Sequence, residues 1–330
     1  MIRSSIRIAS ALALVTLSLP LFMAYGQQQD VPAAPAAAPS SPAPAAAPTF
    51  PKPDPANFTA ASPTKETVNA FVHTSWGFDD SRVWEVWSIK NTPAEGVSRV
   101  TVLVGDKSGK QKPAVVEFYV LPDGKHIIVQ NEILPFGEHP YAEFRALAQK
   151  RADGPYRGSA MKDLEIVEFA DFQCPHCKDA QANMDKLAVD FPKARIVFQT
   201  FPLVSIHPQA ARSAAYGICV TKQGGSDAFF TYAAAVFDGQ EGLASQDGAT
   251  LALNSAVTKA GLDPAKIAEC AATPATVAAV DALVKLAADL NINATPTLLI
   301  NGRQVSATTP YDTLKQIILY QAKLDGVTAQ

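Results

Sequence analysis

The order of apolar and polar residues changes several times along the chain, and the first change lies at the N-terminus. Arg3 and Arg7 precede an almost wholly apolar run at residues 8–24, which ends in small residues. A basic segment, an apolar segment and a small-residue boundary in this order predict a signal peptide over residues 1–26 that is cleaved on export. The alternative is an uncleaved membrane anchor, because the apolar run is close to the minimum length that spans a bilayer.

The next segment has a very different composition. Residues 27–65 are dominated by Ala, Pro and Ser. Such a segment cannot bury enough apolar surface to offset the entropy lost on ordering, and its prolines favour extended conformations. We therefore expect a disordered tether between the signal peptide and the first folded domain.

Residues 66–150 contain a short helical pattern followed by four runs rich in Val, Ile and aromatic residues. The runs cover residues 82–91, 98–106, 114–121 and 125–133. Turn residues separate them, including the pair Asp123-Gly124, which is typical of two-residue hairpins. One helix and an antiparallel meander predict a small α+β domain. Because this region contains no cysteine, we expect it to act in binding or dimerisation and not in chemistry.

The following part of the chain begins with a strand–helix–strand pattern. A nearly continuous apolar run at 164–172 precedes apolar residues at helical spacing over 175–191, and a second apolar run covers 194–203. The Ala-rich stretch from about 207 to 290 shows no strand pattern, and Gly, Pro and Asp divide it into several short helices.

The last apolar run, at 295–305, is interrupted by Asn301-Gly302. This dipeptide predicts a two-residue hairpin turn. Thr309-Pro310 then precedes a final amphipathic helix. The elements from 164 onward predict an α/β domain in which an all-helical segment is inserted before the third strand of the sheet.

Composition narrows the possible functions only a little. The chain has 330 residues, of which 48% are hydrophobic, so it is long enough for two domains with cores. Its net charge is −3 and 18% of its residues are charged, so the sequence gives no support for nucleic acid binding, which needs clustered Lys and Arg. We expect no bound cofactor.

The candidate chemistry lies where the strand at 164–172 meets the helix. Cys174 and Cys177 are three residues apart at the predicted helix start, so their sulfurs can form a disulfide. Pro175 suits the first helical turn, and His176 can add a donor or a positive charge. The helix N-terminus stabilises a thiolate and lowers the pKa of Cys174, from about 8.5 into the range of about 3.5–7. The disulfide form is then expected to be a strong oxidant.

The alternative is that Cys174 and Cys177 form half of a zinc site. A structural zinc site needs four ligands, usually including a second close pair. Cys219 and Cys270 are 51 residues apart and neither has another cysteine nearby, so redox chemistry is favoured and no metal is predicted. In an exported chain this leftover pair favours a structural disulfide, with two buried free thiols as the alternative.

Glu168 is an acidic residue inside an otherwise apolar strand. It alternates with Ile166 and Ala170, which favours a buried position, since central strands are covered on both faces. Burial would raise its pKa and allow it to relay a proton to or from Cys177. The alternative is a solvent-facing strand residue.

Pro296 begins a predicted core strand, where proline is uncommon. A cis Thr295–Pro296 peptide would explain it and would expose the backbone of Thr295 to an incoming peptide. The alternative is an ordinary proline at a strand start. His207, which opens the first inserted helix, is expected to cap or pack and not to act as a catalyst.

The motif FQCPHC between a strand and a helix, the helical insertion at about 207–290 and the later Thr-Pro-Thr strand resemble the DsbA-like thioredoxin-fold family of exported thiol–disulfide oxidoreductases. The resemblance covers about residues 160–325. It implies a thioredoxin fold, places Glu168 where this family keeps a buried acid, and likens Cys219 and Cys270 to a subgroup with a second disulfide. More weakly, residues 66–150 resemble the cystatin-like dimerisation domain of the disulfide isomerases.

This resemblance implies a periplasmic enzyme that introduces disulfides into reduced or unfolded exported proteins. A substrate thiolate would attack Cys174, Cys177 would leave, and a membrane quinone-linked protein would reoxidise the dithiol. The first alternative is a disulfide isomerase or reductase that forms a homodimer through the N-terminal domain, because Thr295 is more typical of isomerases. The second is a tethered, chaperone-like binding protein without enzymatic activity.

Overall fold

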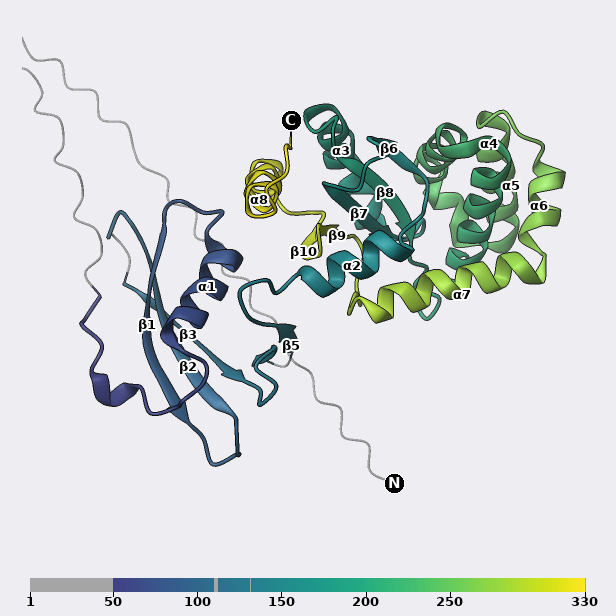
Figure 1. Cartoon of the computed structure of the whole chain (residues 1–330). Coiled ribbons are helices and arrows are strands. Elements are labelled where there is room, and N and C mark those ends of the chain that lie inside the picture. The colour runs from purple at the N-terminus through teal and green to yellow at the C-terminus, as the bar shows by residue number, and fades with distance from the viewer. Residues whose placement is uncertain (1–49, 110–111, 131, 330) are drawn as a thin grey trace, which may run out of the picture. The chain divides into compact units, whose positions relative to one another are not determined.

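The computed structural model describes residues 50–109, 112–130 and 132–329 (Figure 1). The predicted signal peptide at 1–26 and residues 27–49 of the predicted tether lie outside the described residues. Within the described part of the chain, no single helix is long and apolar enough to cross a membrane.

The first domain is built from one long helix and an antiparallel sheet. The helix is α1, Lys65–Trp76, and the sheet has the order β1-β2-β3-β4-β5. Its strands are β1 (Arg82–Asn91), β2 (Ser98–Asp106), β3 (Ala114–Val120), β4 (His126–Val129) and β5 (Glu132–Pro135). Val68 and Val72 of α1 are fully buried in one cluster with the inward side chains of the strands. The helix therefore covers one face of the sheet, as the α+β pattern predicts.

Two boundaries in this domain differ from the sequence prediction. The run at 125–133 is not one strand, because Gln130 adopts a φ of 55° and the chain turns back into β5. The tether predicted over 27–65 also ends earlier than expected. Phe58 packs against the sheet cluster, and the Thr59 N–H donates to the carbonyl of Ile89 at 2.9 Å. The packing of Phe58 and this backbone hydrogen bond attach the end of the proline-rich segment to the domain.

The second domain is centred on a mixed sheet of order β10-β9-β7-β8-β6. The strands are β6 (Tyr156–Gly158), β7 (Glu165–Ala170), β8 (Arg195–Thr200), β9 (Thr297–Ile300) and β10 (Arg303–Ser306). β7 lies between β8, to which it is parallel, and β9, to which it is antiparallel. The predicted Asn301-Gly302 turn joins β9 and β10, with φ values of 44° and 92°.

Helices cover both faces of this sheet. On one face, α3 (Pro175–Asp190) and α8 (Tyr311–Leu324) bury Ile166 of β7. On the other face, α2 (Ala142–Arg151) and α7 (Pro274–Asp289) bury Val167 and Phe169. Because successive strand residues point to opposite faces, Glu168 lies on the same face as Ile166, beneath α3.

The helical insertion forms its own layer beside the sheet. It contains α4 (Ala210–Asp238), the 3₁₀ turn η2 (Gln240–Ala244), α5 (Gln246–Lys259), α6 (Pro264–Ala271) and α7. Figure 1 shows α4, α5 and α6 grouped together, with α7 running back toward the sheet. Helix α4 is broken at Gly225, where φ is 74°, so it consists of two helical segments, in agreement with the short helices expected in this stretch. Stacked aromatic rings, including Phe172 and Phe198, join this layer to the sheet.

Residues 138–163, which precede the apolar run at 164–172, contain two elements that the sequence pattern did not predict, α2 and β6. Ala148 of α2 and Ala152 just after it are buried with Val167 and Phe169 of β7. Helix α2 therefore packs on the second sheet, although it lies within the range predicted for the first domain. Within α2 only Ala148 is buried, and the strand β6 has only three residues, so neither gives a clear hydrophobic period.

Candidate active site

The two closely spaced cysteines lie at the end of β7, where the chain enters α3. Cys174 is the N-cap of α3 and Pro175 is at its first position, so the missing N–H of proline costs no helical hydrogen bond. Cys174 retains an exposed fraction of 6%, whereas Cys177 is fully buried. Both are free thiols in this structure. Only the first sulfur is therefore placed to meet another thiol at the surface.

The environment separates the acidities of the two thiols. A hydrogen bond from the Cys177 thiol lowers the pKa of Cys174 to about 5, with smaller contributions from Thr295 and from the backbone N–H groups of Cys177 and His176. The same pairing with Cys174, together with burial, raises the pKa of Cys177. This arrangement favours a thiolate on Cys174 and a protonated thiol on Cys177. The imidazole of His176 is 73% exposed and lies 3.9 Å from Asp179, so His176 acts on Cys174 through its backbone N–H.

We expect the Cys174 thiolate in the reduced protein to titrate with a midpoint near pH 5, as measured by ultraviolet absorbance of the thiolate. Because its pKa is lowered in the folded dithiol, ionisation stabilises the reduced fold fully above pH about 9, and this contribution is lost as the pH falls through about 5. The Cys174→Ser variant serves as the control and should show no transition in this range. A midpoint near the free-cysteine value of about 8.5 would contradict this assignment.

Thr295 and Pro296 lie directly against Cys174. The Cys174 thiol donates to the carbonyl oxygen of Thr295 at 3.7 Å, and the Thr295–Pro296 peptide is cis. A groove of about 650 Å³ opens beside them, and its lining residues include no Asp, Glu, Lys or Arg. The lining residues are His176, Ala294, Thr295, Pro296, Thr297, Gln304, Val305, Ser306 and Thr308. An extended peptide in this groove would lie beside the Cys174 sulfur.

Glu168 is buried beneath α3, in agreement with the burial expected from its alternation with Ile166 and Ala170. Its exposed fraction is 1%, and burial raises its pKa to about 7. The side-chain amide of Gln181 donates to Glu168 Oε1 at 2.8 Å. A carboxyl with this pKa can exchange a proton near neutral pH.

Asp171 is a second buried acid, which the sequence pattern did not single out. Its carboxylate accepts from the N–H groups of Gln173 and Leu203, and His207 Nδ1 lies 2.8 Å from its Oδ2. The Asp171 N–H itself donates to Cys177 Sγ at 3.4 Å. His207 therefore packs against an acid at the base of the cysteine loop. The sequence signal that could have identified Asp171 is its position as an acidic residue directly after the buried strand β7.

Gln240 in η2 connects the cysteine loop to the helical insertion. Its side-chain amide donates to the carbonyl of Phe172 at 2.8 Å and to that of Cys174 at 3.0 Å. These contacts join residues far apart in the sequence, so no local pattern could predict them. The insertion thereby helps to fix the loop that carries Cys174.

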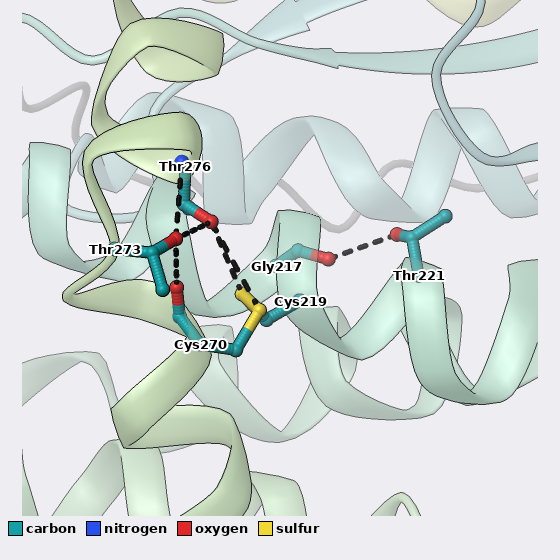
Figure 2. Close-up of a disulfide and its surroundings, with 6 residues drawn as sticks. All are labelled: Gly217, Cys219, Thr221, Cys270, Thr273 and Thr276. Atoms are coloured by element: carbon teal, nitrogen blue, oxygen red, sulfur yellow. Dashed lines mark hydrogen bonds between the residues drawn. A yellow bond between two sulfur atoms is a disulfide. The ribbon is translucent and has the colours of Figure 1, made fainter.

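Cys219 of α4 and Cys270 of α6 form a disulfide (Figure 2). The hydroxyl of Thr276, which is fully buried, lies 3.6 Å from the Cys219 sulfur and 3.9 Å from the Cys270 sulfur. These two cysteines are therefore not zinc ligands for the Cys174 pair. Among the described residues, no group of three or more His, Cys, Asp or Glu side chains is placed to hold a metal ion.

Residues 150–319, which include the paired thiols at the strand–helix junction, match the thioredoxin family model. The match covers more than half of the chain. The chain belongs to the thioredoxin family. The family match begins at residue 150, so the likeness of the N-terminal domain to a cystatin-like dimerisation domain stays a prediction. Family membership together with the paired thiols supports a thiol:disulfide oxidoreductase.

Two curated relatives are similar to parts of this chain that differ in length. Disulfide bond formation protein D of Bacillus subtilis is 26% identical over 172 residues, which are 51% of this chain and 77% of the relative. Na(+)/H(+) antiporter NhaA 3 of Salinispora tropica is 35% identical over 68 residues, which are 21% of this chain. The chain spans only 10% of the length of that antiporter.

Two solved structures each cover about half of this chain. The structure of oxidised BdbD from Bacillus subtilis covers 52% of this chain and 93% of its own, with 23% identity and a TM-score of 0.46. The structure of DsbA2 from Pseudomonas aeruginosa covers 51% of this chain and 94% of its own, with 27% identity and a TM-score of 0.44.

Proposed function

We propose that this protein is an exported thiol:disulfide oxidase that donates the Cys174–Cys177 disulfide to reduced proteins. The observation that carries the proposal is the asymmetry of the two thiols. The Cys174 thiolate is stabilised, with a pKa of about 5, whereas the pKa of Cys177 is raised. Stabilising the thiolate lowers the free energy of the reduced form, so the disulfide form accepts electrons more readily.

The reaction consists of two exchanges. A substrate thiolate attacks Cys174 Sγ, a mixed disulfide forms, and the Cys174–Cys177 bond breaks with its electrons on Cys177. Cys177 then takes up a proton, for which the buried carboxyl of Glu168 is the proposed donor. A second substrate thiolate attacks the substrate sulfur of the mixed disulfide, and Cys174 leaves as a stable thiolate. The substrate gains a disulfide, and the protein is left as a dithiol.

We place this activity in the periplasm. The proposal is supported by the predicted signal peptide over residues 1–26 and by the Cys219–Cys270 disulfide, since such bonds persist in oxidising compartments. Retention of the signal as a membrane tether is the alternative. The proposed partners are reduced or unfolded exported proteins, and a membrane quinone-linked protein that restores the disulfide.

A disulfide isomerase or reductase is the second candidate, and a specific observation favours it. Thr295 precedes the cis-proline, and a threonine at this position is more typical of isomerases. Under this function the N-terminal domain would form a homodimer, and the Cys174 thiol would be kept reduced to attack wrongly paired disulfides.

Thiol trapping in the native envelope distinguishes the two candidates. For an oxidase we expect mass spectrometry to find no alkylated cysteine, because Cys174–Cys177 and Cys219–Cys270 are both bridged. Alkylation confined to Cys174 and Cys177 would overturn the oxidase proposal in favour of an isomerase or reductase. A sample reduced and denatured before alkylation is the control, and it should show all four cysteines modified.

A further inference from the structure

Gln181 lies one helical turn after Cys177 on α3, and its side-chain amide contacts both the carboxyl of Glu168 and the backbone of Cys177. Nε2 donates to Glu168 Oε1 at 2.8 Å and to the backbone carbonyl of Cys177 at 3.0 Å. A primary amide nitrogen carries two hydrogens, so a single group can make both contacts. Gln181 therefore bridges the buried acid and the residue that carries the buried thiol.

The charged groups that face Glu168 are few. Arg157 of β6 lowers its pKa and Asp185 of α3 raises it, while burial is the largest influence and raises it. After burial, the hydrogen bond from Gln181 has the largest effect, and it lowers the pKa of Glu168. An amide N–H can only donate, so it stabilises the ionised carboxylate over the protonated acid.

We propose that Gln181 is a positioning residue that holds the Glu168 carboxylate beside the first turn of α3, ready to exchange a proton with Cys177. The proposal rests on the thiol–disulfide exchange proposed above, in either its oxidase or its isomerase form. Without this donor, the buried carboxyl has lost a hydrogen bond that favours its ionised form. Proton transfer from Cys177 then requires a higher pH.

The step that tests the role is closure of the active-site disulfide. In the reduced full-length protein, Cys174 reacts with Ellman's reagent to give a mixed disulfide with thionitrobenzoate. The Cys177 thiol loses its proton to the Glu168 carboxylate, and its sulfur attacks Cys174 Sγ. The mixed disulfide breaks, thionitrobenzoate leaves as a coloured thiolate, and the Cys174–Cys177 bond forms. Stopped-flow absorbance follows this second release as a function of pH.

Gln181→Met removes the donor and keeps a side chain of similar length. We expect the midpoint of the pH–rate profile to rise by about one unit from about 7, so that release near pH 7 slows about fivefold and recovers at higher pH. A profile that coincides with that of the wild type, at unchanged melting temperature, would overturn the role of Gln181.

Two comparisons separate positioning from a general effect on the fold. Asn183 lies on the same helix, and its amide donates to the carbonyls of Ala307 and Thr309, so Asn183→Leu should leave the profile in place. In a Glu168→Gln background, Gln181→Met should cause no further shift. An equal shift in that background would show that Gln181 acts without Glu168 and would refute the proposal. A wild-type protein that releases no second thionitrobenzoate would instead refute the proposed function.

Discussion

Replacing Cys174 with serine is expected to lower the rate of disulfide formation in a reduced test protein to the uncatalysed rate, a loss of at least about a thousandfold. The reason is that Cys174 carries the sulfur nearest the surface and the stabilised thiolate, whereas Cys177 is fully buried and its pKa is raised. The measurement is the rate at which a reduced, denatured substrate regains its disulfides when the purified protein is added in oxidised form.

Cys177→Ser is the matched control, because it removes the other sulfur from the same turn of α3. The variant should also fail to complete oxidation, but its Cys174 thiolate should attack a substrate disulfide and keep the mixed disulfide, since the resolving thiol is absent. Non-reducing electrophoresis and mass spectrometry would detect the adduct. A Cys174→Ser variant that accumulates substrate on Cys177 would reverse the assigned order of attack.

The sequence predicts well those parts of the fold and of the site that depend on residues adjacent in the chain. The apolar run before Cys174 and the proline after it indicate a strand entering a helix, and β7 and α3 occupy these positions. The dipeptide Asn301-Gly302 favours positive φ angles at both residues, and the structure has them. Each of these signals depends only on residues adjacent in the chain.

Contacts between distant residues account for what the sequence does not predict. The links from Gln181 to Glu168 and from Gln240 to Cys174 are side-chain hydrogen bonds that exist only after α3 and η2 have packed. A glutamine gives no periodic signal of such a role, because it is equally suited to a solvated helix face. The end of the tether was missed for a related reason, since Phe58 and the backbone hydrogen bond from Thr59 attach it to a strand about 30 residues further along the chain, at Ile89.

Removing the structural disulfide should have the largest effect on stability. The Cys219–Cys270 bond closes a span of 51 residues and joins α4 to α6. Loop-closure entropy for a span of this length predicts that Cys219→Ala/Cys270→Ala lowers the free energy of unfolding by about 4 kcal/mol. For a domain of this size the melting temperature should fall by about 8–16 °C, measured by calorimetry or circular dichroism.

The loss of the cross-link must be separated from the loss of two sulfur atoms from the core, since Cys219 is fully buried beside Thr276. The matched experiment uses Cys174→Ser/Cys177→Ser, in which a reductant can act only on the structural bond. Adding the reductant should lower the melting temperature of this variant by nearly the same amount as the alanine pair does. If the reductant has little effect while the alanine pair is strongly destabilised, packing of the sulfurs holds α4 and α6 together and the cross-link adds little.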